Sequence, residues 1–343
     1  MLEPTTCQAR PDLLVQEQAT KVPEPNATDS QLIVGLAQIA PVWLDRKSTL
    51  EKIISSVEAA AKENCSLVAF GETLLPGYPF WLSTTGGSKF NNEIQKDIYA
   101  RYLGEAVDIS AGHLDQIAKI AKAHNIEVML GCFEKGTDRG GHTGYCSLVR
   151  IDRQGTIANV HRKLMPTYEE RLAWGIGDAH GLRTFELGKF TVGGLNCWEN
   201  WMPLARTALY AQGENLHVAV WPGCKRNTVE ITRFVALESR SFVISVGGLL
   251  RKSDIPTDFP HRDLVIDSFE DDIISDGGSC IAAPDGRWIV EPLCDREELI
   301  VQEIDFTEVL RERQNFDPSG HYSRPDVLQV AVNRERQNVL KEI

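Results

Sequence analysis

The chain has 343 residues, of which 42% are hydrophobic and 24% charged, so its composition is that of a globular protein with enough apolar residues for a sizeable core. A formal net charge of -12 and a pI near 5.2 argue against a nucleic acid or an anionic membrane surface as the main partner. A neutral or small substrate fits this charge better.

The first thirty residues contain no apolar stretch longer than residues 13–15, which is too short for a secretory signal. No segment approaches the roughly 20 apolar residues that span a bilayer, so we expect a cytosolic protein without a membrane partner. Its eight cysteines lack close CxxC pairs and its eight histidines lack HxxxH or HxH spacing. The sequence therefore predicts free thiols and no metal site.

The chain begins with a polar stretch and continues as alternating strands and helices. Residues 1–30 predict a flexible tail, because they are rich in proline and polar residues. The apolar run 31–37 predicts a buried strand, and apolar residues at helical spacing from Leu50 to Ala61 predict the helix that follows it. A strand at 66–70, a helix near 114–121 and a strand at 126–130 continue the pattern.

Two β-hairpins interrupt this alternation. The first joins strands at 147–151 and 156–161, and the second joins strands at 280–283 and 288–290. Between the hairpins we expect a strand near 190–196, a helix near 201–212, a strand near 218–221, a helix near 228–240 and a strand near 242–247. Hairpins require antiparallel pairs, so the prediction is an α/β protein with a mixed sheet covered by helices.

No stretch of linker composition divides residues 31–316, which we interpret as one domain. Residues 317–343 begin with too many turn-forming residues for a core element. We expect this C-terminal tail to wrap a surface or to reach a partner subunit.

The segment around Cys197 is the most informative part of the sequence. An apolar strand with Gly193 and Gly194 ends at Cys197, and a helix is predicted to begin within a few residues, with Pro203 tolerated in its first turn. At such a turn, backbone N–H groups and the helix N-terminus favour the thiolate, whose share decides cysteine reactivity. A buried structural cysteine gains nothing from this position, so Cys197 is the candidate nucleophile.

Two other predicted strands end in charged side chains. Lys163 ends one strand directly before a loop turned by Pro166, and Glu72 follows the strand at 66–70. By residue type alone, the lysine is most often a solvated surface charge, the glutamate a polar boundary residue and a cysteine a small buried hydrophobe. Functional sites in sheets of this kind gather at the carboxyl ends of strands, so the three side chains can meet.

Over roughly residues 31–330 the chain resembles the nitrilase superfamily, whose Glu-Lys-Cys triad occupies three such segments. The motifs CWEN at 197–200, RKLMPTYEER at 162–171 and HYSRPD at 321–326 are similar to those of the nitrilase branch itself. The resemblance implies a four-layer α-β-β-α sandwich that pairs into a homodimer and often grows into larger homo-oligomers. Gly71 is a departure, because many relatives have proline there.

By this resemblance Glu72 is the general base, Lys163 stabilises developing charge and Cys197 is the nucleophile. Glu170 matches the second glutamate of the family, while a surface role stays open for it by residue type. The implied reaction converts a small-molecule nitrile into a carboxylic acid and ammonia through a covalent thioimidate and a thioester, without a cofactor.

Trp81, Trp174 and Trp198 lie near the triad segments in the sequence, and we name them as candidates for an apolar pocket, although aromatic residues belong more often to a core. Two enzymatic alternatives use the same triad: a cyanide hydratase, which stops at the amide, and an amidase or carbamoylase. The non-enzyme alternative is a catalytically silent scaffold, against which the intact triad argues.

Overall fold

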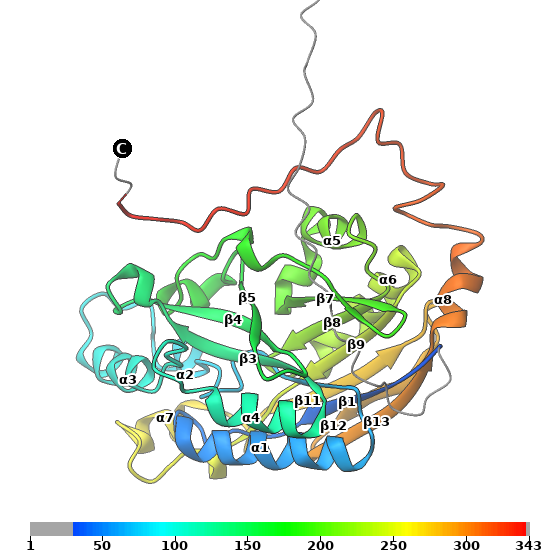
Figure 1. Cartoon of the computed structure of the whole chain (residues 1–343). Coiled ribbons are helices and arrows are strands. Elements are labelled where there is room, and N and C mark those ends of the chain that lie inside the picture. Colours follow the sequence, from blue (N-terminus) through cyan, green and yellow to red (C-terminus); the bar gives the residue numbers. More distant parts are fainter. Residues whose placement is uncertain (1–29, 341–343) are drawn as a thin grey trace, which may run out of the picture.

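The computed structural model describes residues 30–340 and contains two mixed β-sheets with helices on their outer faces (Figure 1). The predicted N-terminal tail, residues 1–30, lies outside this range except for Ser30. None of the helices within 30–340 is long and apolar enough to cross a membrane.

Six strands form the first sheet, in the order β13-β1-β2-β3-β4-β5. β1, β2 and β3 are parallel, β4 is antiparallel to both β3 and β5, and β13 is antiparallel to β1. The strands are β1 (Gln31–Gln38), β2 (Leu67–Phe70), β3 (Glu127–Lys135), β4 (Gly144–Ile151), β5 (Ile157–Arg162) and β13 (Glu298–Asp305). β2 and β5 therefore run in the same direction and end at the same edge.

Seven strands form the second sheet, in the order β10-β11-β9-β8-β7-β6, with β12 paired to β11. β7, β8 and β9 are parallel, and the remaining pairs are antiparallel. The strands are β6 (Phe185–Leu187), β7 (Phe190–Asn196), β8 (Leu216–Trp221), β9 (Phe242–Gly247), β10 (Leu249–Arg251), β11 (Ile273–Ala282) and β12 (Trp288–Cys294).

Helices cover the outer face of each sheet. α1 (Arg46–Lys62) and α4 (Asp115–His124) lie on the six-stranded sheet, and α5 (Pro203–Tyr210) and α6 (Lys225–Ser239) lie on the seven-stranded sheet (Figure 1). The other helices are α2 (Trp81–Thr84), α3 (Glu93–Gly104), α7 (Arg262–Ser268) and α8 (Phe306–Arg313).

Apolar side chains hold the layers together. The inner faces of the two sheets share one cluster, in which Val34 and Ala69 of the first sheet pack with Val218 and Ile244 of the second. Ile53 of α1 belongs to another cluster, on the outer face of the first sheet. Complete burial of one such aliphatic side chain is worth about 1.5–3 kcal/mol, so these clusters are the main stabilising contribution to the four layers.

The architecture confirms the α/β class and the four-layer sandwich implied by the resemblance. The sequence patterns alone predicted a single mixed sheet, because a strand's alternation does not reveal which sheet it joins. Seven α-helices and strands had no counterpart in the prediction: α2, α3, α7, α8, β6, β10 and β13. β13 escaped notice because charged residues stand at both of its ends and only two of its side chains are buried, which suits a strand at the edge of a sheet.

Residues 317–340 contain no helix or strand and return across the molecule (Figure 1). Arg336 Nη1 lies 3.0 Å from Asp178 Oδ1, and Gln337 Nε2 donates to the Gly177 carbonyl at 2.9 Å. The described part of the tail therefore contacts the loop before β6 in its own chain. Its predicted place at a subunit interface stays a prediction, as does its boundary with the domain at residue 316.

Candidate active site

The three candidate catalytic residues come from the ends of three strands in two different sheets. Glu72 follows β2 and Lys163 follows β5, both in the six-stranded sheet, whereas Cys197 follows β7 in the other sheet. A carboxylate oxygen of Glu72, one of Glu170 and the Cys197 Sγ all lie within 4.8 Å of one another. Folding thus brings Glu72 and Cys197, which are 125 positions apart in the sequence, into one buried cluster.

The Lys163 ammonium lies between two carboxylates. Its Nζ donates to Glu72 Oε1 at 2.8 Å and to Glu170 Oε2 at 2.7 Å, and all three side chains are buried. Burial alone would lower the pKa of Lys163, but its interactions with Glu72, Cys197 and Glu170 outweigh burial and hold this pKa well above its usual value. Lys163 is therefore a fixed positive charge at the centre of the site.

Glu170 holds the lysine and is itself held on both oxygens. It lies in a 3-10 turn, Tyr168–Leu172, where its Oε2 also accepts from the Thr167 backbone N–H at 2.6 Å. Its Oε1 accepts from the Tyr78 hydroxyl at 2.8 Å. Glu170 is buried and both of its carboxylate oxygens are hydrogen-bonded, so it is not the surface residue that its residue type alone left possible.

Glu72 has one bonded and one free carboxylate oxygen. Oε1 accepts from Lys163 and, at 3.3 Å, from the Cys146 thiol, whereas Oε2 has no hydrogen-bond partner among residues 30–340. Burial raises the pKa of Glu72 to about 7, because the opposing effect of Lys163 is only partial and Glu170 adds a like charge. A free oxygen with this pKa suits a general base near neutral pH.

Cys197 begins a 3-10 turn, Cys197–Trp201, with a φ of 49°, in the left-handed region that L residues rarely adopt. The Asn200 side-chain amide donates to the Cys197 carbonyl at 2.8 Å. Burial, Glu72 and Glu170 together raise the pKa of the Cys197 thiol well above its usual value, although Lys163 and the Trp198 N–H oppose them. The Trp198 N–H therefore favours the thiolate, as the sequence predicts, but burial and the two carboxylates outweigh it, so the nucleophile needs a base.

A second thiol in the site was missed by the sequence reasoning. Cys146 lies inside β4 and donates to Glu72, and its backbone carbonyl accepts from the Lys163 N–H at 2.8 Å. The pairing of the predicted hairpin could have revealed Cys146. Ser147 pairs with Arg162, so in an antiparallel pair the preceding residue, Cys146, lies opposite Lys163. Tyr78 was missed as well, since it lies in a loop without a periodic pattern.

A cavity of about 510 Å³ opens onto this cluster. Cys197 and Glu170 lie on its wall together with Tyr78, Phe80 and Trp198, and Trp198 is 52% exposed. Cys146 does not line this cavity, so of the two thiols beside Glu72 only Cys197 faces the space where a substrate fits.

Two of the three candidate pocket tryptophans do not line this cavity. Trp174 is buried behind Lys163, with its ring centroid 5.3 Å from the ammonium and its N–H donating to the Tyr102 hydroxyl at 3.0 Å. Trp81 begins α2 and packs against Trp43 and Tyr102 in the core. For Trp81 the pocket assignment is corrected, because its large apolar surface is buried by neighbouring aromatic rings.

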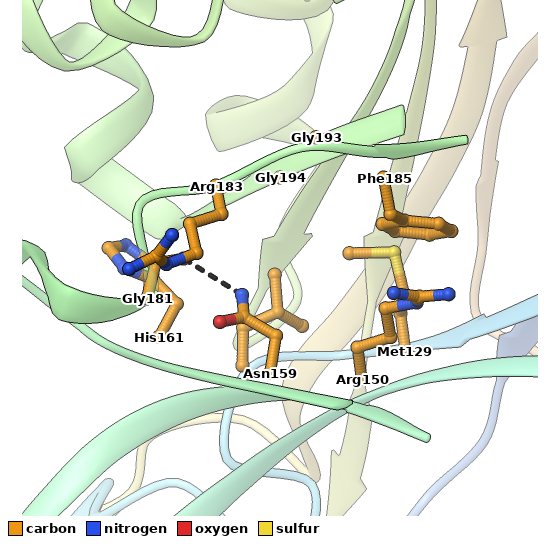
Figure 2. Close-up of a pocket in the computed structure, with 10 residues that line it drawn as sticks. Met129, Arg150, Asn159, His161, Gly181, Arg183, Phe185, Gly193 and Gly194 are labelled. Atoms are coloured by element: carbon orange, nitrogen blue, oxygen red, sulfur yellow. Dashed lines mark hydrogen bonds between the residues drawn. The ribbon is translucent and has the colours of Figure 1, made fainter. Parts of the chain in front are cut away.

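A smaller cavity, of about 10 Å³, lies between the two sheets (Figure 2). Its wall includes Met129 and Arg150 of the first sheet and Gly193 and Gly194 of the second. This volume holds about one water molecule, so an organic substrate does not fit.

Glu72, Glu170 and Cys197 are also the side chains of residues 30–340 whose donor atoms are close enough together to hold a metal ion. The Lys163 Nζ already contacts both carboxylates, at 2.8 and 2.7 Å. The lysine ammonium therefore already occupies the space between these donor atoms. A divalent cation bound there would be repelled by this charge, so the donor set does not fit a metal ion.

Comparison with known proteins places these residues in a family. Residues 33–313 match the family model described as carbon-nitrogen hydrolase. A nitrilase 2 from an unknown prokaryotic organism is 36% identical over 313 residues, covering 90% of this chain and 95% of that protein. A bifunctional nitrilase/nitrile hydratase from Nicotiana tabacum is 32% identical over 312 residues, covering 90% of this chain and 87% of that protein.

A solved structure with the same fold is the carbon-nitrogen hydrolase from Helicobacter pylori G27, with a TM-score of 0.64. It is 21% identical, and the match covers 86% of this chain and 96% of that one. Residues 33–313, which match the family model, include the strand ends that carry Glu72, Lys163 and Cys197. The chain therefore belongs to the carbon-nitrogen hydrolase family.

Proposed function

We propose that this hydrolase is a nitrilase, which converts an organic nitrile into the carboxylic acid and ammonia without a cofactor. The observation that carries the proposal is the buried Lys163 ammonium between Glu72 and Glu170, in a cluster with the Cys197 thiol, which faces the large cavity. The similarity to proteins named as nitrilases, at 32–36% identity over about nine-tenths of the chain, favours a nitrile over an amide.

In the first step, Glu72 takes the proton of the Cys197 thiol, and the sulfur attacks the nitrile carbon to give a thioimidate. The base is needed because the pKa of this thiol is raised, and the free Glu72 Oε2 is the oxygen available for its proton. Lys163 and the Trp198 N–H stabilise the negative charge that develops on the substrate nitrogen.

Glu72 then returns the thiol proton to the substrate nitrogen, which completes the neutral thioimidate, and as a carboxylate again it activates a water molecule that adds to the thioimidate carbon. Ammonia leaves, which gives a thioester, and a second water then releases the carboxylic acid and restores the thiol. The net reaction consumes two water molecules for each nitrile and needs no oxidant or reductant.

Formation of an amide is the second candidate outcome, because one similar relative is named for both a nitrilase and a nitrile hydratase activity. After water has added, the tetrahedral carbon can expel the Cys197 sulfur instead of ammonia, and the amide then leaves. The balance between the two leaving groups decides the product.

The product spectrum from aliphatic, aryl and arylaceto nitriles tests the proposal. We expect acid and ammonia in equal amounts, measured by chromatography and an ammonia assay. Amide in place of acid would identify a hydratase, turnover of amides alone would identify an amidase, and no turnover of either class would leave the scaffold interpretation.

The nucleophile is tested by two matched thiol substitutions. C197A should abolish turnover, because Cys197 is the cavity-lining thiol that lies beside Glu72 and Glu170, whereas Cys224, which also lines the cavity, does not belong to this cluster. C146A should lower kcat only about fivefold, since it removes one hydrogen bond worth about 1 kcal/mol from Glu72. Persistent activity in C197A, or loss of activity in C146A alone, would contradict the assignment.

A further inference from the structure

A buried carboxylate that the mechanism does not use lies between two of the catalytic segments. Glu199 Oε1 accepts from the Leu164 backbone N–H at 2.9 Å, and its Oε2 accepts from the Asn196 backbone N–H at 2.9 Å. Leu164 follows Lys163, and Asn196 precedes Cys197. One side chain therefore binds the backbone beside the ammonium and the backbone beside the nucleophile.

These two backbone segments belong to different sheets. Lys163 follows β5, the last strand of the six-stranded sheet, and Cys197 follows β7 of the seven-stranded sheet. Packing between sheets is largely non-directional, so apolar contacts alone define the spacing of the two strand ends loosely. The two hydrogen bonds of Glu199 are directional, and they define the distance between the ends.

His161 completes the surroundings of Glu199. Its Nε2 lies 3.0 Å from both Glu199 oxygens, and both side chains are buried. A carboxylate accepts hydrogen bonds, so Nε2 carries the hydrogen. Although burial opposes ionisation, His161 and the two backbone N–H groups outweigh it and hold the pKa of Glu199 below its usual value. His161 also borders the small cavity between the sheets (Figure 2).

A buried charge is costly, and an apolar side chain of similar size would fill the same space without that cost. The carboxylate at this position is therefore better explained by the spacing that it imposes on the two strand ends than by a contribution to the free energy of unfolding. It is also close to the strained part of the turn, because Asn196 directly precedes the positive φ of Cys197.

We propose that Glu199 is a positioning residue, which sets the distance and orientation between Lys163 and Cys197, with His161 as the group that holds Glu199 in place. This inference rests on the proposed catalytic roles of Lys163 and Cys197. Glu199 itself does not line the substrate cavity.

The first test is the kinetics of E199Q on the best substrate of the nitrile panel. Glutamine has one acceptor oxygen, so its NH₂ group would face the N–H of either Leu164 or Asn196. We expect kcat to fall about 10- to 100-fold with a much smaller change in KM, because a small misplacement of reacting groups slows the chemical step.

The matched control is E127Q. Glu127 is also buried and paired, with Arg150 at 2.9 Å, but it lies at the amino end of β3, away from the site. E127Q should reduce the melting temperature without changing kcat. If E199Q lowers the melting temperature in the same way and leaves kcat unchanged, Glu199 is merely structural and the proposal is wrong.

A second pair of variants keeps the test decisive if E199Q does not fold. H161Q retains a side-chain N–H near the position of His161 Nε2, whereas H161L removes it. We expect H161L to lose kcat about tenfold or more and H161Q to recover most of it. Equal activity in both variants and the wild type would overturn the role of His161 and, with it, the proposal.

Alkylation of Cys197 by iodoacetamide gives a readout that does not require turnover. Mass spectrometry of the Cys197 peptide should show a wild-type rate that rises near pH 7, where Glu72 becomes able to take the thiol proton, and an E199Q rate that stays low through this range, because the pKa of the thiol is raised and the base no longer faces it. An unchanged profile would refute the positioning role. If the wild type hydrolyses neither nitriles nor amides, the proposed function fails, while this profile still decides the role of Glu199.

Discussion

At the scale of single residues, the charge balance around Lys163 determines how the site works. When Glu72 is ionised, above its pKa of about 7, one ammonium faces two carboxylates and a neutral thiol, so the cluster carries one net negative charge. Transfer of the Cys197 proton to Glu72 moves that charge onto sulfur without changing the total. Lys163 stays within contact distance of the carboxylates throughout, so little reorganisation accompanies the transfer.

The pKa of Glu72 predicts how activity depends on pH. Glu72 accepts the thiol proton only as a carboxylate, and burial raises its pKa to about 7. We therefore expect kcat/KM of the wild type to fall as the pH drops below about 7, approaching tenfold per pH unit. A pH–rate profile measures this limb, and constant kcat/KM down to pH 5 would be inconsistent with Glu72 as the base.

Substitution of Glu170 should shift the pH at which kcat/KM falls, which is the acid limb of the pH–rate profile. The Glu170 charge is one of the causes that raise the pKa of Glu72, so E170Q should shift the acid limb to lower pH while it also lowers kcat. Y78F is the control, because it removes the hydrogen bond to Glu170 but leaves the charge. A limb at the same pH in E170Q and Y78F would contradict this coupling.

At the scale of the elements, the carboxyl end of β2 is pressed against the second sheet. The Glu72 N–H donates to the Trp221 carbonyl of β8 at 2.9 Å. A Cβ at Gly71 would lie 2.8 Å from the Gly248 nitrogen and 2.9 Å from the same Trp221 carbonyl. The glycine at this position thus permits close contact between the sheets, and a proline would not fit this backbone.

This contact predicts the effect of G71A. The added methyl group meets backbone atoms that cannot rotate away, so we expect a loss of about 1–3 kcal/mol in the free energy of unfolding. G104A, at the end of α3, adds the same methyl group where no atom lies within 4 Å, and it should be neutral or slightly stabilising. Denaturant unfolding compares the two, and equal stabilities would refute the steric argument.

The spacing of apolar residues in the sequence identified most helices and strands of the sandwich, but it did not identify which strands pair with each other. The strands at 31–37 and 66–70 were readable because almost every side chain in them is buried. Which sheet a strand joins depends on long-range pairing, which its own residues do not encode. The same limit explains Trp81, because a tryptophan close to a catalytic residue in sequence can still point into a core.

The candidate site was predictable to a similar degree. Each of Glu72, Lys163 and Cys197 stands at the end of an apolar strand, and the resemblance to a known family connected the three. Tyr78 and Cys146 were not predictable from residue type, because a loop tyrosine and a strand cysteine have many ordinary roles. Their roles follow from the contacts that the fold creates with Glu170 and Glu72.

At the scale of the whole molecule, α5 and α6 present apolar side chains to solvent. Leu204 is 71% exposed, Phe234 45% and Leu237 41%, and the Trp201 ring stacks on Phe234 with centroids 6.4 Å apart. Exposed apolar residues grouped on one face often mark a contact with another protein chain. We expect this face to be buried in the predicted homodimer or larger homo-oligomer.

A charged substitution tests this face. L204D places a carboxylate in the expected contact, so light scattering should report fewer subunits per particle than for the wild type. L310D is the control, because Leu310 is also an exposed leucine, at 58%, but belongs to α8. An unchanged particle mass for L204D would remove α5 and α6 from the expected interface.

The division of the catalytic groups between two sheets has a further consequence. Neither half of the sandwich contains a complete set, so hydrolysis demands that both layers have docked in their final alignment. A chain in which the strands have formed but the two sheets have not yet packed together is inactive. Catalysis therefore requires the completely folded chain, and the first appearance of activity during refolding reports when the two sheets pack against each other.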